Sequence, residues 1–327
     1  MHSSTSNKPV LLTCGDPNGI GLDISALAFQ GIGAQHPFVL IADAEHIAAR
    51  APDVNLNVIE DLSDLHGERS ENLTVLHHTF PEMPSLDGIQ YGNAQATIDV
   101  INRAVSLILD KKASAVVTNP IHKHVLQKGA GFEHPGHTEY LAHLGGVQRS
   151  VMMLANPKLR VVPATIHIAL DQVPITLTKD LLRETISITI NDLKGKLNIA
   201  EPRIAVAGLN PHAGENGAFG QEELETISPV IDEFQKQGVN IFGPLSADTL
   251  FHDDARENYD CAICMYHDQA LIPSKTLDFH GGVNVTLGLP FIRTSPDHGT
   301  AFDLAGTNKA NPQSLINAIK LAHQLAQ

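Results

Sequence analysis

The sequence predicts an α/β protein. Short apolar runs of strand length alternate with longer segments in which apolar residues recur at helical spacing. Polar and glycine-rich residues follow several of the predicted strands directly, and open α/β sheets bind their ligands at that edge. The 327 residues suffice for two α/β lobes or one large domain, and no Pro/Gly/Ser-rich linker separates lobes. Two lobes would therefore require the chain to pass between them more than once.

The individual elements follow from the same two periodicities. Strands are predicted at 10–13, 38–42, 115–118, 151–154, 160–168, 203–207, 261–265, 283–287 and 291–295. Helices are predicted from near Asp23, from Ala44, and at 93–110, 177–193, 221–237 and 312–326. This mixed order of strands and helices is typical of α/β folds.

Composition and charge exclude some classes of function. The formal net charge is -14, so we expect no nucleic acid and no anionic membrane as partner. The chain has no apolar run long enough to span a membrane, and its first residues lack an apolar signal core, so we expect a cytoplasmic protein. Cys261 and Cys264 lie three apart in an apolar run that reads as a buried strand, which favours a core role over a redox or zinc pair.

Two loops have the composition of anion-binding sites. The stretch 13–21 (TCGDPNGIG) resembles a phosphate-cradling loop, but it lacks the Lys-Ser/Thr of a Walker A motif and the spacing of the dinucleotide fingerprint. The alternative interpretation is a glycine-rich turn before a helix. His137 and Thr138 stand at a predicted helix start, where they can donate to an anion; the alternative is a capping box with Thr138 as cap.

Three histidines stand at the ends of predicted strands: His167, His212 and His267. Three imidazoles with an open coordination position are the catalytic pattern for a divalent ion such as zinc. Because the chain has 18 histidines, chance placement remains the alternative.

Further donors lie toward the C-terminus. Lys275, Asn284 and Arg293 can supply the donors that phosphate and carboxylate need, or they can form a solvated sheet edge. The stretch 297–306 (DHGTAFDLAG), followed by Ala310-Asn311-Pro312, is either a loop that lets backbone amides approach a nucleotide or a structured surface loop.

With these motifs in view, the chain resembles the 4-hydroxythreonine-4-phosphate dehydrogenase family of pyridoxal phosphate biosynthesis, nearly end to end. The motifs that carry the resemblance are GDPNGIG at 15–21, TNPIHK at 118–123, PGHTE at 135–139, LNPHAGE at 209–215 and YHDQA at 266–270. The family is similar in fold to isocitrate and isopropylmalate dehydrogenases, which implies two α/β/α lobes with a cleft between them. We expect a first lobe of 1–130 plus 270–327 with the nucleotide loop, and a second lobe of 131–269 with the metal ligands and dimer contacts.

The resemblance also implies residue roles. His167, His212 and His267 align with the metal ligands, for zinc, magnesium or cobalt. His137, Thr138, Lys275, Asn284 and Arg293 align with substrate-binding positions. The implied cofactor is NAD or NADP, with Gly299, Thr300, Asp303 and Asn311 as cofactor-binding residues. Lys275 and Asp248 are the candidate catalytic residues, and a homodimer with the site near the interface is implied.

The implied reaction is oxidation of 4-phosphohydroxy-L-threonine at C3 followed by decarboxylation to 3-amino-2-oxopropyl phosphate. The chain departs from the commoner family residues at Asn18, Leu22-Asp23, Asn119 and His122. These departures leave room for a paralogue that acts on D-erythronate or D-threonate 4-phosphate or a related hydroxy acid. The remaining alternatives are a non-catalytic binding protein and a phosphotransacetylase-like acyltransferase.

Overall fold

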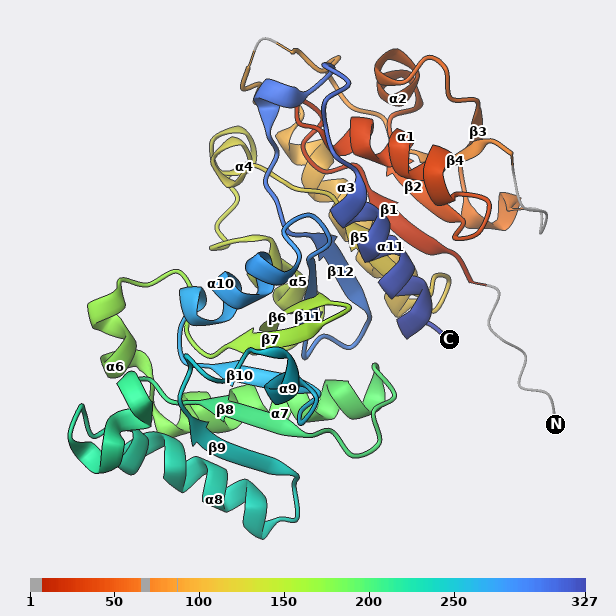
Figure 1. Ribbon diagram of the computed structural model, residues 1–327. Coiled ribbons are helices and arrows are strands. Elements are labelled where there is room, and N and C mark those ends of the chain that lie inside the picture. Colours follow the sequence, from red (N-terminus) through yellow and green to blue (C-terminus); the bar gives the residue numbers. More distant parts are fainter. Residues whose placement is uncertain (1–7, 66–70, 87) are drawn as a thin grey trace, which may run out of the picture. The chain divides into compact units, whose positions relative to one another are not determined.

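The computed structural model describes residues 8–65, 71–86 and 88–327, and it confirms the α/β class (Figure 1). The chain forms two compact units: unit 1 comprises Met1–Arg149 and Leu289–Gln327, and unit 2 comprises Ser150–Gly288. The lobe boundaries were expected after residues 130 and 269, whereas the structure places them after residues 149 and 288. The reason is packing, because α5 (His137–Leu144) contacts α3 (Ala94–Leu109) of unit 1, while α10 (His267–Leu277) contacts strands of unit 2.

Unit 1 contains a parallel sheet. Its strand order is β3 (Leu56–Ile59), β4 (Leu73–His77), β2 (Phe38–Ala42), β1 (Val10–Thr13), β5 (Ala115–Thr118) and β12 (Arg293–Pro296). Its helices are α1 (Gly21–Ile32), α2 (Ala44–Arg50), α3, α4 (Lys123–Ala130), α5 and α11 (Gln313–Leu325). The central strands are apolar on both faces and fully buried, as expected where helices cover both sides.

The direction of the crossovers explains that coverage. The connection through α1 leads from β1 to the neighbouring strand β2. The connection through α3 leads from β4 to β5, across β2 and β1, and so runs in the opposite direction along the sheet. Right-handed crossovers in opposite directions place α1 and α3 on opposite faces. All the parallel strands end at one edge, so the residues that follow β1 and β5 come together there.

Unit 2 contains a mixed sheet. Its strand order is β11 (Val283–Leu287), β6 (Val151–Asn156), β7 (Leu159–Pro163), β10 (Cys261–Cys264), β8 (Ile204–Ala207) and β9 (Ile241–Leu245). The last four strands run parallel to one another, and β6 is antiparallel to both of its neighbours. Its helices are α6 (Val173–Thr176), α7 (Lys179–Gly195), α8 (Ser228–Lys236), α9 (Asp253–Arg256) and α10.

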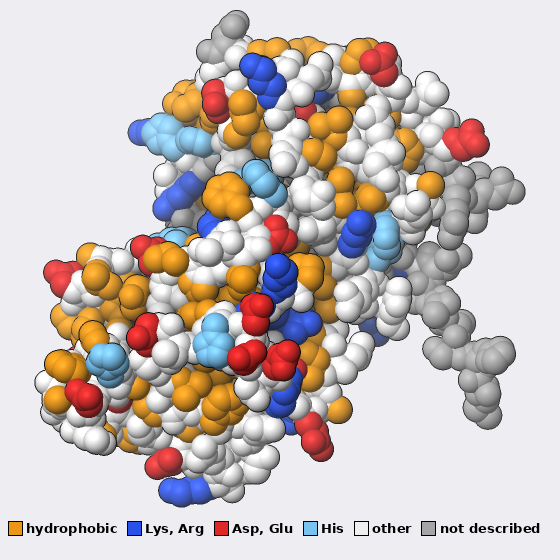
Figure 2. Space-filling view, in the orientation of Figure 1, with side chains coloured by type: hydrophobic (Ala, Val, Ile, Leu, Met, Phe, Trp, Pro, Cys, Tyr) orange, Lys and Arg blue, Asp and Glu red, His pale blue; other side chains and the backbone are white. Residues whose placement is uncertain are grey.

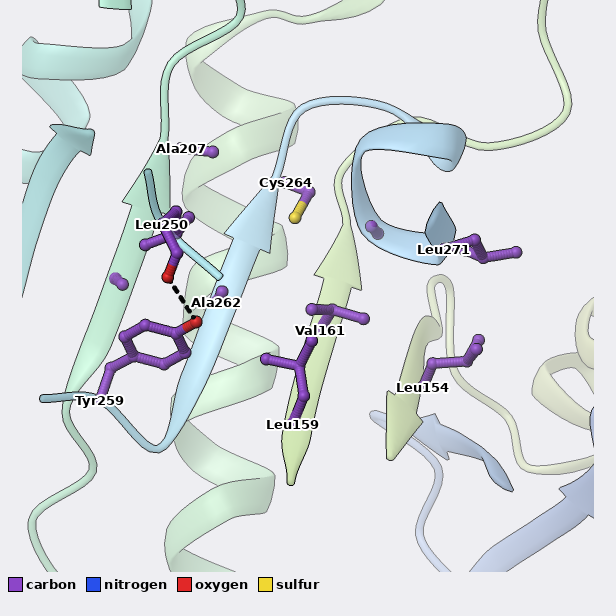
Figure 3. Packing of buried hydrophobic residues seen from close by; sticks show 11 residues of the cluster. Leu154, Leu159, Val161, Ala207, Leu250, Tyr259, Ala262, Cys264 and Leu271 are labelled. Carbon is purple, nitrogen blue, oxygen red and sulfur yellow. Dashed lines mark hydrogen bonds between the residues drawn. The ribbon is translucent and has the colours of Figure 1, made fainter. Parts of the chain in front are cut away.

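A hydrophobic cluster supports the parallel strands of unit 2. Figure 3 shows side chains of β7 and β10 packed with Leu271 of α10 and with Leu250, whose carbonyl accepts a 3.0 Å hydrogen bond from Tyr259 Oη. Cys264 belongs to this cluster, and both Cys261 and Cys264 are free and fully buried. Their burial confirms the predicted core role of the pair, and it raises the pKa of the Cys261 thiol to about 12.

Some elements differ from the sequence prediction. The predicted strand 160–168 ends at Pro163, so His167 lies in a loop. The predicted helix 221–237 begins with a π-helical turn at Glu223–Ile227 before α8. Strands β3, β4 and β9 were not predicted. β3 and β9 are only partly buried, whereas β4 is a largely buried run that the sequence prediction missed. Among the described residues, the structure contains no helix with the length and apolarity to cross a membrane.

Candidate functional site

The three predicted metal-ligand histidines follow three neighbouring strands of unit 2. β10 lies between β7 and β8 and is parallel to both. His167 follows β7, His212 follows β8 in the turn Pro211–Gly217, and His267 is the first residue of α10, directly after β10. Since the carboxyl ends of parallel strands share an edge, the topology carries all three imidazoles to one edge of the unit 2 sheet.

Two of these imidazoles have the spacing of metal ligands. The ring centroids of His167 and His267 lie 5.6 Å apart. Two imidazoles bound tetrahedrally at the usual metal–nitrogen distance would have centroids about 5 Å apart. Nδ1 of His267 lies 2.7 Å from Oδ1 of Asp268, and a carboxylate in that position orients an imidazole so that Nε2 is available as a ligand.

The third imidazole is placed by an unusual loop. His167 and His212 have φ angles of 54° and 53°, in the left-handed region that side chains rarely adopt. Ala213, Glu215 and Asn216 share this conformation. Backbone strain of this kind persists where the surroundings enforce it, and it gathers at functional sites.

Glu223 enforces the conformation of the His212 loop. Its buried carboxylate accepts hydrogen bonds from the backbone N–H of Asn210 at 2.7 Å and from Asn210 Nδ2 at 2.9 Å. A Cβ at Gly214 would lie 2.6 Å from Glu223 Oε2, so only glycine fits there. The sequence analysis missed Glu223; the signal was an acidic residue placed shortly after a glycine-rich loop.

The three histidines therefore fit a divalent ion in three respects. Imidazole is a suitable ligand, all three residues follow neighbouring strands at one edge of the sheet, and the His167–His267 pair has the spacing of ligands. In the described parts of the chain, no group of three or more His, Cys, Asp or Glu side chains is close enough to hold an ion. His212 lies near Asp248, whose pKa is lowered mainly by a 2.5 Å hydrogen bond from the Ser246 hydroxyl and further by His212.

A pocket of about 450 Å³ adjoins the histidine pair. His167, Tyr266, His267 and Asp268 form its polar wall, and Ile168, Leu170 and Ile272 are among its apolar lining. Lys275 lies two turns after His267 on α10, with Nζ 5.7 Å from the centre of the Phe279 ring. Asn284 on β11 has a buried Oδ1 with no hydrogen-bond partner in the described chain.

Unit 1 contains a buried arginine. Arg293 begins β12 and donates from Nε and Nη2 to Thr118 Oγ1 at 3.1 and 2.7 Å. Burial lowers the pKa of Arg293 to about 10, so the guanidinium remains charged at neutral pH. Arg293 pairs in register with Val116, two residues before Thr118, which puts both side chains on the same face of the sheet. The solvated-edge interpretation of Arg293 is therefore wrong.

His137 lies near this guanidinium. It is the first residue of α5, and its Nε2 is shielded from solvent with no partner among the described residues. Burial, together with the Arg293 charge, lowers the pKa of His137 well below its ordinary value. The N-cap of α5 is Gly136, without a side-chain cap, so the interpretation of Thr138 as the cap is wrong. A neutral imidazole and a buried guanidinium are together suited to bind an oxyanion.

The predicted cofactor-binding residues lie in a loop that packs on 13–21. Ile20 N–H donates to the carbonyl of Thr300 at 2.9 Å, and Gly306 N–H donates to Asp23 Oδ1 at 3.0 Å. Asp23 is held by a 2.6 Å ion pair with Arg50. Gly299 faces open space, Asp303 is exposed, and Asn311 Oδ1 accepts from Gln313 N–H at the start of α11.

Comparison with known proteins identifies the family of this chain. Residues 34–322 match the profile of the family described as "Pyridoxal phosphate biosynthetic protein PdxA". The chain belongs to the PdxA family. Among curated relatives, the 4-hydroxythreonine-4-phosphate dehydrogenase of Roseobacter denitrificans is 52% identical over 99% of this chain and 98% of its own length.

Solved structures of similar proteins show the same fold. The 4-hydroxythreonine-4-phosphate dehydrogenase of Klebsiella pneumoniae matches with a TM-score of 0.89 and 36% identity, covering 98% of this chain and 100% of that one. A terephthalate 1,2-cis-dihydrodiol dehydrogenase of Burkholderia xenovorans matches with a TM-score of 0.68 and 26% identity, over 97% of this chain and 98% of that one. The family and these relatives identify the protein as an oxidoreductase of pyridoxine biosynthesis.

Proposed function

We propose that this protein oxidises 4-phosphohydroxy-L-threonine at C3 with NAD or NADP in a metal-dependent reaction, and that decarboxylation then gives 3-amino-2-oxopropyl phosphate for pyridoxal 5'-phosphate synthesis. The observation that carries the proposal is the end-to-end similarity to curated dehydrogenases of that substrate. The histidine pair of unit 2 and the buried guanidinium of unit 1 support it independently.

His167, His212 and His267 would hold a divalent ion, with zinc, magnesium and cobalt as the candidates. A bound ion of this kind supplies Lewis acidity, which lowers the pKa of a coordinated hydroxyl. Asp268 orients His267, and Glu223 fixes the loop of His212. Since imidazole accepts several metals, the identity of the ion follows from the metal-dependence of turnover.

Charged and polar side chains would bind the substrate. Arg293, with His137 and Thr138 at the start of α5, would form a donor set for the phosphate. Lys275 and Asn284 are the other proposed substrate-binding residues. The hydrogen bond from the Ser246 hydroxyl lowers the pKa of Asp248 and so favours its carboxylate form, which can accept a hydrogen bond from the substrate's amino group. Lys275 and Asp248 are the proposed proton-transfer residues.

Gly299, Thr300, Asp303 and Asn311 would contact the cofactor. The open space beside Gly299 lets a phosphate or ribose approach the backbone, and the contact of Thr300 with Ile20 fixes the loop. The cofactor supplies the hydride chemistry, and these residues position it.

A homodimer is proposed from the surface of unit 2. Large apolar side chains that are mostly exposed gather there, and they include Leu170, Ile175, Ile272 and Phe279. Figure 2 shows hydrophobic side chains around the positions of α6 and α10. Because Leu170 and Ile272 also line the pocket beside His167 and His267, this interface would adjoin the metal site.

The test is NADH formation with the purified protein, NAD and 4-phosphohydroxy-L-threonine, before and after chelation and after addition of zinc, magnesium or cobalt. Activity that is lost on chelation and restored by metal is the expected result. His212→Ala should abolish metal-dependent turnover, whereas His252→Asn, at the exposed start of α9, should not. Full activity of a metal-loaded His212→Ala enzyme would show that the ligand assignment is wrong.

A second candidate is a paralogue for D-erythronate or D-threonate 4-phosphate or a related diol. The likeness to a dihydrodiol dehydrogenase favours it, because it indicates that this scaffold accepts hydroxylated substrates without an amino group. Oxidation of these sugar-acid phosphates, with 4-phosphohydroxy-L-threonine left unchanged, would select this candidate.

A further inference from the structure

Unit 1 contains polar side chains that the proposed residue roles leave unused. Asp16, Asn18 and Asn119 are 4%, 3% and 0% exposed. Each has one side-chain oxygen, Oδ2 of Asp16 and Oδ1 of the two asparagines, that is buried without a hydrogen-bond partner in the described chain. A buried polar atom without a hydrogen bond is costly, so three such atoms in one region call for a ligand.

The other atoms of these side chains are occupied, which identifies the free atoms as acceptors. Asp16 Oδ1 accepts from Asn18 N–H at 3.0 Å, and Asn18 Nδ2 donates to the Gly88 carbonyl at 2.9 Å. Asn119 Nδ2 donates to the Gly21 carbonyl and to Ser25 Oγ, at 3.2 and 2.9 Å. Both asparagine oxygens are thereby assigned, and the set offers acceptors to whatever binds there.

The backbone brings the three residues to one place, the carboxyl ends of β1 and β5. Asn119 N–H donates to the Thr13 carbonyl at 3.3 Å, and Asp16 N–H donates to the Pro120 carbonyl at 2.9 Å. Gly15 is required between them, since its φ is +75° and a Cβ would lie 2.4 Å from the Pro120 oxygen. Ligands of open α/β sheets bind at this edge.

The loop proposed to bind the nucleotide is built onto the same residues. A Cβ at Gly19 would lie 2.8 Å from the Thr300 carbonyl oxygen, and the hydrogen bond from Ile20 to Thr300 adjoins it. On the β5 side, the rings of His122 and Phe302 lie 5.2 Å apart. Both acceptor-bearing segments, 13–21 and 119–122, therefore contact loop 298–306.

We propose that Asp16, Asn18 and Asn119 form an acceptor site for ribose hydroxyl groups of the nicotinamide dinucleotide. The inference rests on the proposed function, because it assigns part of its cofactor to these residues. Ribose hydroxyls are the donors that such a cofactor presents, and an acidic side chain that accepts from them is a general device of dinucleotide sites. Burial raises the pKa of Asp16 to about 6, consistent with a carboxylate that lacks donors until a ligand arrives.

The test measures binding of NAD to the full-length wild type and to Asp16→Asn by isothermal titration calorimetry, with ADP-ribose and nicotinamide mononucleotide as separate probes. The substitution preserves size and removes the charge, so we expect NAD affinity to fall about 10- to 100-fold. The fragment that shows the same loss identifies which of the two riboses is bound. Asn18→Ala should weaken NAD binding by a smaller factor.

Asp43→Asn is the matched control. Asp43 is a buried carboxylate directly after the parallel strand β2, but both of its oxygens already accept from backbone N–H groups, of Glu45 and Phe80. This variant should bind NAD like the wild type.

Three outcomes overturn the proposal. The first is unchanged NAD affinity of Asp16→Asn. The second is a rise only in the KM for 4-phosphohydroxy-L-threonine, which would assign the acceptors to the substrate's amino group. The third is a wild type that binds neither NAD nor NADP, which also overturns the proposed function. The two proposals can also be told apart. If NAD binding depends on Asp16 but the wild type does not oxidise 4-phosphohydroxy-L-threonine, this site is supported and only the proposed function is contradicted.

Discussion

At the scale of single residues, burial has shifted the candidate site groups of unit 1 toward their neutral forms. Burial raises the pKa of Asp16, lowers that of His137 well below its ordinary value, and lowers that of Arg293 to about 10. Each group has therefore lost water on folding, which is costly in the free protein. Asp16 Oδ2 and His137 Nε2 have no hydrogen-bond partner among the described residues, so a ligand can supply the contacts that these two groups lack.

Asp16→Asn should therefore stabilise the ligand-free protein. The pKa of Asp16 rises from 3.8 to about 6 on folding, which corresponds to roughly 3 kcal/mol against folding when the carboxylate is ionised. The Asp16 carboxyl binds its proton more tightly in the folded state than in the unfolded state. The cost of ionising it therefore develops as pH rises from about 4 to 6 and is complete above that range. We expect the variant to gain about 1–3 kcal/mol at pH 7.5, measured by urea unfolding.

The pH profile separates this effect from a general change in packing. The gain in the free energy of unfolding from Asp16→Asn should shrink steadily between pH 6 and pH 4. Over this range the wild-type carboxyl becomes protonated, and so as neutral as the amide that replaces it. A gain that is the same at pH 7.5 and pH 4 would show that ionisation of Asp16 is not its cause.

At the scale of elements, the sequence predicted which segments carry polar residues but not how their loops are shaped. It identified His167, His212 and His267 as strand-end residues, since apolar strands are readable from composition. It extended the strand that precedes His167 as far as residue 168, because apolar residues continue beyond Pro163, where the strand ends. The left-handed turn at His212 depends on Glu223. The pairing of His137 with Arg293, which suits them to bind an oxyanion, joins residues that are far apart in the chain. Contacts of this kind depend on tertiary packing, which a single sequence does not display.

Glu223→Gln should loosen the loop of His212 and weaken metal binding. The amide loses the charge that strengthens the two hydrogen bonds from Asn210. Because partners that position a ligand typically contribute 10- to 100-fold in metal affinity, we expect zinc or cobalt to bind about 10-fold more weakly by calorimetry. Glu225→Gln, an exposed change two residues on, is the control. Equal metal affinity in the two variants would refute the positioning role of Glu223.

At the scale of the whole molecule, the α/β class was predictable and the unit boundaries were not. Periodicity identifies strands and helices, but membership of a unit depends on pairing between distant segments. β11 pairs with β6 although more than a hundred residues separate them, and α10 packs on β7. These pairings assign 270–288 to unit 2, whereas the sequence analysis had assigned that stretch to the first lobe. The contact of α5 with α3 likewise assigns 137–144 to unit 1.

The exposed apolar surface of unit 2 leads to a prediction about assembly. Ile175 and Leu170 are 71% and 70% exposed, and burial of such a side chain contributes about 1.5–3 kcal/mol to association. A charge on that surface removes this gain and adds a desolvation cost, so Ile175→Asp should convert a dimer to a monomer at micromolar concentration. Light scattering after size exclusion measures this change. Leu109→Asp is the control, because Leu109 is 46% exposed at the end of α3 in unit 1 and should leave the dimer intact. A monomeric wild type, or dissociation by the control alone, would show that this surface of unit 2 is not the interface.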